Sequence, residues 1–162
     1  MGLLLRIITK PKWLKPDWMD PEEVPADALT DLRSSQNELS VWSVERDKSN
    51  LDTVLVAVGS NRERLDKLDY ALFDEDILPA IQIKCTKSEG ETPHVIANKV
   101  MHRDLVELTA QKVAHLARAL MPPTEHVRVS ERSLQRLLQN ALRDGSLDRS
   151  RVVDSMLAEL EH

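Results

Sequence analysis

The chain has 162 residues, of which 41% are hydrophobic and 30% are charged, and its formal net charge is −5. These values predict one main folded domain with a short appendage, and they exclude an intrinsically disordered chain. Aromatic residues make up only 3% of the chain, which disfavours a surface that binds single-stranded nucleic acid by base stacking.

Residues 3–9 are a short apolar run, rich in Leu and Ile, that predicts a buried strand. The run is too short for a signal peptide, and no stretch of the sequence approaches the roughly 20 apolar residues of a membrane span. We therefore expect a cytoplasmic protein with no membrane segment.

Residues 11–25 contain four of the eight prolines in the chain. Prolines at this density prevent a helix from running through the segment. Trp13 and Trp18 lie in the same segment and predict an extended arm that is held against the body by two indoles. An arm that binds a partner is the alternative.

Three segments after the arm predict two further strands of a small sheet and one helix between them. Residues 38–45 carry apolar side chains at both parities, as a central strand does. Ser49 begins a predicted helix whose apolar residues keep helical spacing as far as Leu65. Residues 80–86 alternate apolar and polar side chains and predict a half-buried strand, with Cys85 on its core face. Because Cys85 is the only cysteine, an internal disulfide and a zinc site built from cysteines are excluded.

The second half of the chain predicts mainly helices. Thr92 and Pro93 predict a helix start, and apolar residues then keep helical spacing as far as Leu120, in one long helix or two. Two amphipathic helices follow across a turn at Gly145 and predict a helical hairpin at the C-terminus.

Together these elements predict an α+β fold, in which a small mixed or antiparallel sheet is covered by helices and followed by a C-terminal helical hairpin. We expect residues 1–121 to form the main α+β domain and residues 122–159 to form the hairpin appendage. Residues 160–162, Leu-Glu-His, resemble the remnant of a purification tag.

The predicted hairpin must dock on another surface, because two short helices bury little area against each other alone. We expect a symmetric homodimer whose interface contains Leu138 and Leu142, with docking on the main body as the alternative. A DNA-reading helix-turn-helix is disfavoured, since Arg151 stands where the second helix of that motif needs an aliphatic residue. The segment also carries no net positive charge.

Acidic residues are concentrated in residues 16–76, which contain 16 Asp or Glu and 6 Lys or Arg. Such a segment repels nucleic acid and attracts basic partners. Asp74, Glu75 and Asp76 are adjacent and are the candidate binding residues of this acidic surface. A solvated face without a partner is the alternative.

His94, His102 and Arg103 are the candidate catalytic residues. His94 lies near the start of a predicted helix, where the helix dipole favours the neutral imidazole that a general base needs. Either histidine could supply acid/base catalysis, and Arg103, next to His102, suits a phosphate-containing substrate. The chain has no His-Glu-x-x-His motif, and we expect neither a metal nor a cofactor.

The distribution of charge favours a non-enzymatic cytosolic protein that binds or regulates a protein partner through its acidic surface. A small enzyme with a histidine acid/base, acting on a phosphate-containing substrate, is the first alternative. A DNA-associated regulator that acts through the C-terminal helices is the second, although the acidic charge makes nucleic acid an unfavourable partner.

Overall fold

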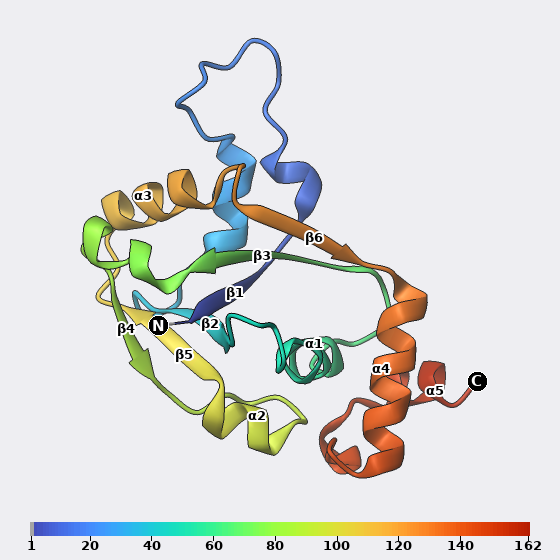
Figure 1. Ribbon diagram of the computed structural model, residues 1–162. Coiled ribbons are helices and arrows are strands. Elements are labelled where there is room, and N and C mark those ends of the chain that lie inside the picture. The colour runs from blue at the N-terminus through green and yellow to red at the C-terminus, as the bar shows by residue number, and fades with distance from the viewer. Residues whose placement is uncertain (1) are drawn as a thin grey trace.

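A six-stranded antiparallel sheet forms the middle layer of the protein (Figure 1). The structure is a computed structural model and describes residues 2–162. Its strands are β1 (Leu3–Ile8), β2 (Leu39–Val44), β3 (Leu68–Asp74), β4 (Lys84–Lys87), β5 (His102–Val106) and β6 (Glu125–Val129). They lie in the order β4-β5-β2-β1-β3-β6, and each neighbouring pair is antiparallel. The α+β fold class is therefore confirmed, with the sheet antiparallel.

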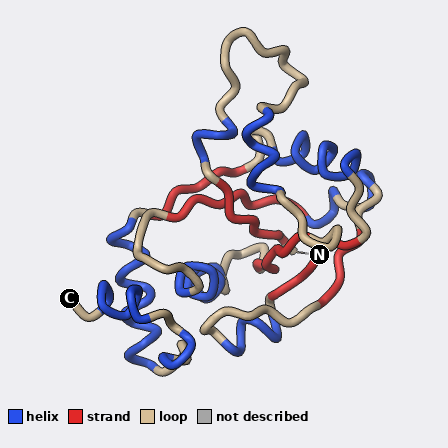
Figure 2. Tube along the Cα trace, turned by 180° about the vertical axis from the view of Figure 1, so that it is seen from behind, coloured by secondary structure: helices blue, strands red, loops and turns tan. Residues whose placement is uncertain are grey.

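Helices cover both faces of this sheet (Figures 1 and 2). One face packs against α1 (Leu51–Ser60), α2 (Val95–Val100), α4 (Glu131–Asp144) and α5 (Asp154–Leu160). The other packs against α3 (Ala110–Leu120) and the 3-10 segments η1 (Lys10–Trp13) and η2 (Ala26–Leu32). Three further 3-10 turns are η3 (Glu75–Ile77), η4 (Pro79–Ile81) and η5 (Arg149–Arg151). None of the helices within residues 2–162 has the length and hydropathy of a membrane-spanning segment.

Alternation along the central strands explains why both faces are covered. In β1, Leu5 points into the core beneath α1 and α4, which we call the α1-side core. Leu4 and Ile8 point into the core beneath α3, the α3-side core. Strand β2 divides in the same way, with Trp42 on the α1 side and Val41 on the α3 side. Because both faces of these strands are apolar, each needs its own layer of helix.

Two strands, β3 and β5, are not predicted by the sequence patterns. Strand β5 lies within residues 92–120, where the spacing of apolar residues predicts helix. That prediction is wrong because Leu105 is buried through the pairing of β5 with β2 and β4, not on a helix face. Strand β3 is buried along nearly all of its length, so its side chains show no alternation. The strand expected over residues 80–86 starts only at Lys84, since η4 occupies its first residues.

Helix α4 packs on α1 of the same chain. Leu134 and Leu138 of α4 are 0% exposed in the α1-side core. A Cβ atom at Gly59 of α1 would lie 2.8 Å from Leu134 Cδ1, so the glycine lets the two helices approach closely.

The segment expected as an appendage shares the sheet and the core of the main body. Within residues 122–159, β6 pairs with β3, and α4 and α5 contribute to the α1-side core. Leu142 is partly exposed and packs against this core. Leu138 is fully buried there, so it is not available to a second copy of the chain. Leu138 therefore packs on the main body of its own chain, which was the alternative to a dimer. The expectation that Leu138 lies at a dimer interface is corrected.

The arm between η1 and η2 is held by one tryptophan. Trp13 is 1% exposed, and its Nε1 donates a hydrogen bond to Asp31 Oδ2 at 2.8 Å. The backbone N–H of Thr9 donates to the same oxygen at 2.7 Å. Trp18 is 80% exposed, in the loop that stands out from the body in both views (Figures 1 and 2). The prediction that two indoles hold the arm is therefore wrong for Trp18.

We predict that Leu138→Ala lowers the free energy of unfolding by about 2–5 kcal/mol, because it removes buried methyl groups and leaves a cavity beside α1. Urea unfolding followed by circular dichroism measures the change. Arg136→Ala, at an exposed position of the same helix, is the control and should change stability by less than about 0.5 kcal/mol. A stable wild-type dimer that Leu138→Ala converts into an equally stable monomer would contradict this packing.

Candidate functional site

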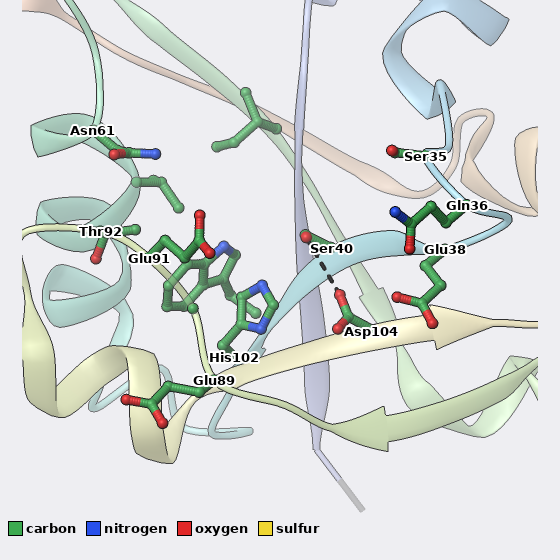
Figure 3. Close-up of a pocket in the computed structure, with 14 residues that line it drawn as sticks. Ser35, Gln36, Glu38, Ser40, Asn61, Glu89, Glu91, Thr92, His102 and Asp104 are labelled. Atoms are coloured by element: carbon green, nitrogen blue, oxygen red, sulfur yellow. Dashed lines mark hydrogen bonds between the residues drawn. The ribbon is translucent and has the colours of Figure 1, made fainter.

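A cleft of about 530 Å³ opens on the α1 side of the sheet, over β1, β2 and β5 (Figure 3). Its walls are the loop before β2, the end of α1 and the loop between β4 and α2. The strands contribute the side chains of Ile7, Ser40, Trp42, His102 and Asp104. The pairing of the strands therefore determines which groups meet at the floor of the cleft.

The register of β2 and β5 brings four of these side chains together. Ser40 lies opposite Asp104, and Trp42 lies opposite His102. Because side chains alternate along each strand, all four share one face of the sheet. The Ser40 hydroxyl donates a hydrogen bond to Asp104 Oδ1 at 3.3 Å, although the two residues are 64 positions apart.

His102 is held in one orientation between the walls of the cleft. The residue is 7% exposed, and its Nδ1 lies 2.8 Å from Ser88 Oγ. Its ring meets the Trp42 ring edge to face, with the centroids 5.0 Å apart. The ring lines the cleft (Figure 3), and its Nε2 has no hydrogen-bond partner in the part of the chain that the structure describes. Nε2 is therefore available to a ligand.

The environment of His102 favours its neutral form. Burial lowers the pKa of His102 below its ordinary value, although Asp104, Ser88 and Glu91 act in the opposite direction. The ordinary pKa is about 6.5, so the ring is neutral at pH 7. In the tautomer with its proton on Nδ1, donated to the Ser88 hydroxyl, the ring presents Nε2 as a hydrogen-bond acceptor.

Asn98 fixes the loop that forms one wall of the cleft. Its Oδ1 accepts hydrogen bonds from the backbone N–H and the hydroxyl of Thr92, at 3.1 and 2.6 Å, and its Nδ2 donates to the Thr92 carbonyl at 2.8 Å. The Gly90 N–H donates to the Asn98 carbonyl at 3.0 Å. A Cβ atom at Gly90 would lie 3.1 Å from the Trp42 ring and 3.2 Å from the His102 ring. Glycine thus allows the loop to lie directly on both rings.

Carboxylates dominate the charge of the cleft. Glu38, Glu89, Glu91 and Asp104 line it, and no lysine or arginine of residues 2–162 lines it with them. In Figure 3, Glu89 and Glu91 lie on one side of His102, and Glu38 and Asp104 lie on the other. Such a lining attracts a cation and repels phosphate.

His94 and Arg103, the other predicted catalytic residues, do not line the cleft. His94 is buried and caps α2, where its Nδ1 accepts a hydrogen bond from the Ala97 N–H at 3.2 Å. Arg103 donates through Nη1 to the carbonyl oxygens of Val100 and His102, at 2.9 and 2.8 Å. The structure therefore does not gather the three predicted residues into one catalytic group.

The predicted binding residues Asp74, Glu75 and Asp76 lie at the end of β3 and in η3, outside the cleft. Arg46 Nη2 lies 3.1 Å from a carboxylate oxygen of Asp74 and 3.3 Å from one of Asp76. One guanidinium thus pairs with two of these three carboxylates and offsets one of their negative charges. The cleft is the stronger candidate for a basic ligand.

Comparison with protein-family models finds no match, and searches of curated proteins and of solved structures also find none. Among the described residues, no group of three or more His, Cys, Asp or Glu side chains is arranged to hold a metal ion. The cleft is therefore the feature of this chain from which a function can be inferred.

The sequence patterns do not indicate Trp42, Asp104 or the two glutamates of the loop as site residues. One local signal exists, because Ser40 interrupts the apolar face of β2 that also carries Trp42. A polar, exposed position in a face that is otherwise buried marks a place where the core stops. The residues opposite that position come from β5, and no local pattern predicts the pairing.

We predict that the free energy of unfolding falls as the pH is lowered from about 7 to about 5.5. Burial lowers the pKa of both His94 and His102 in the folded chain. Below about pH 6.5 the unfolded chain therefore binds protons that the folded chain does not, and stability is lost. Urea unfolding at the two pH values measures the effect, and His102→Gln should reduce it. An NMR titration that places the His102 pKa above about 6.5 would contradict the prediction.

We predict that the Cys85 thiol reacts slowly in the folded chain. Its side chain packs against the α3-side core, and burial raises the pKa of the thiol to about 11, with Glu75 acting in the same direction. Roughly one thiol in a thousand is then ionised at pH 8, and only the thiolate is nucleophilic. Labelling with Ellman's reagent should be slow in buffer and fast in urea. Equally fast labelling in both would support a nucleophilic Cys85 instead.

Proposed function

We propose that this protein is a non-enzymatic binding protein that takes a basic side chain of a protein partner into the cleft. The observation that carries the proposal is the lining, with four carboxylates and no lysine or arginine from the described residues. Exposed ion pairs are individually weak, so binding should need several of the carboxylates together and should weaken as salt is added.

The rings of the cleft support the same ligand. Ile7, Val58 and the accessible part of the largely buried Trp42 give an apolar surface for the methylene stem of a lysine or arginine, a packing that such side chains commonly use. In the tautomer with its proton on Nδ1, neutral His102 accepts a hydrogen bond at Nε2, which a positively charged N–H donor supplies. Charge, shape and hydrogen bonding therefore favour one class of ligand.

The same features weigh against an enzyme that acts on a phosphate-containing substrate. A phosphate in the cleft would face carboxylates on both sides of His102. The Ser40 hydroxyl on the floor donates to Asp104, and the hydroxyl that His102 does contact, that of Ser88, is not among the groups that line the cleft, so the cleft offers a substrate no histidine-activated serine. The binding function requires neither a nucleophile nor an anion site.

We predict that a short fluorescein-labelled peptide of alternating lysine and alanine binds the protein at low salt, as measured by fluorescence anisotropy. The double variant Glu38→Gln with Asp104→Asn should weaken binding about tenfold, because it removes two of the charges that face the peptide. Asp17→Asn with Glu22→Gln, at exposed positions of the arm, changes the net charge equally and should leave affinity within about twofold.

Equal losses in the two double variants would contradict the proposal, since the peptide would then respond to net charge and not to the cleft. Tighter binding of a phosphorylated peptide than of the lysine peptide would also contradict it and would favour the phosphate alternative.

A further inference from the structure

The four carboxylates of the cleft belong to two different parts of the fold. Asp104 is on β5, and Glu38 directly precedes β2. Glu89 and Glu91 lie on the loop between β4 and α2. Figure 3 shows these two groups on opposite sides of His102. The negative charge of the cleft is thus divided between two ends.

Strand geometry gives the scale of the separation. Glu38 and Trp42 are four residues apart along one strand direction, which corresponds to about 13 Å between their backbones, and Asp104, opposite Ser40, lies about half as far from the Trp42 end. Gly90 packs on the Trp42 ring. Glu89 and Glu91, which flank Gly90 in the sequence, therefore lie near Trp42 and not near Glu38. A single ammonium group contacts carboxylate oxygens at about 3 Å and does not bridge ends this far apart.

Apolar and uncharged groups complete the cleft. Ile7 of β1, Val58 of α1 and Trp42 of β2 give it an apolar surface. His102, nine-tenths buried, lies between the charged ends and presents an Nε2 that nothing in the described chain satisfies. The described residues hold no buried side-chain nitrogen or oxygen that lacks a hydrogen-bond partner, so this Nε2 is open to the cleft, where a ligand can reach it.

We infer that the cleft takes a ligand with two positively charged nitrogens joined by an aliphatic stretch. The two charges pair with the two groups of carboxylates, and the aliphatic stretch packs on the apolar side chains. A linear diamine and two lysine side chains of one peptide share this chemistry. The inference rests on the proposed function and adds to it the number and spacing of the charges.

The test compares ligands with one and two cations. Amide NMR spectra follow the binding of n-butylamine and of linear diamines from putrescine to octamethylenediamine. The best diamine should bind at least about tenfold more tightly than n-butylamine, and affinity should pass through a maximum with chain length. Glu89→Gln with Glu91→Gln should abolish this preference for the diamine. Asp17→Asn with Glu22→Gln should preserve it.

Peptides with one and with two lysines distinguish the source of the ligand. A preference for two cations among the free diamines supports a small-molecule ligand, and a preference among the peptides alone supports a protein ligand. If neither series prefers two cations but affinity still falls with Glu38→Gln and Asp104→Asn, the inference is overturned and the proposed function stands. If no amine or peptide binds, or if no cleft variant changes an affinity, both are overturned.

Discussion

The antiparallel pairing of β5 with β2 is the constraint on which the cleft and two of the six strands of the sheet depend. It places His102 opposite Trp42, and it joins β4 to the sheet through β5. A slip of one residue would turn His102 and Asp104 to the other face of the sheet. It would also remove Leu105 from the α3-side core, where it is fully buried. Burial of one leucine on one face therefore helps to hold the polar groups of the opposite face in place.

The sequence predicts those helices and strands whose formation depends on neighbouring residues, such as a helix cap, a turn glycine or a run of apolar side chains. Helix α4 begins with the Ser130 hydroxyl accepting a hydrogen bond from the Ser133 N–H, and it ends at the predicted turn at Gly145, whose φ of 81° suits glycine. Strands β1 and β2 follow from their apolar runs. Strand β5 does not follow, because the three-residue spacing of Leu105 and Leu108 fits one face of a helix better than the two-residue alternation of a strand. The decision between them comes from β2, whose residues lie about 60 positions earlier, and single-chain periodicity carries no information about that partner.

The candidate site shows the same division between local and long-range information. The sequence indicates His94 and His102 as similar candidates, and in the structure both are buried with a lowered pKa. They differ in their surroundings, since His94 caps α2 whereas His102 lines the cleft. That difference depends on the register of β5 and on Gly90, which allows the loop to lie on the ring. The acidic bias of the chain was visible in its composition, but its concentration around His102 required the fold.

The acidic lining opposes folding unless its charges are separated, screened or paired. Glu38, Glu89 and Glu91 are exposed, so water and salt reduce their mutual repulsion, and the half-buried Asp104 has the Ser40 hydroxyl as a partner. A cation that binds only the folded chain removes the remaining repulsion and shifts the folding equilibrium toward that state. The strand register and the hydrogen bonds of Asn98 hold the backbone that carries these four residues in position before any ligand arrives. Little ordering is then required on binding, and affinity depends mainly on how well the charges of the ligand match the spacing of the two ends.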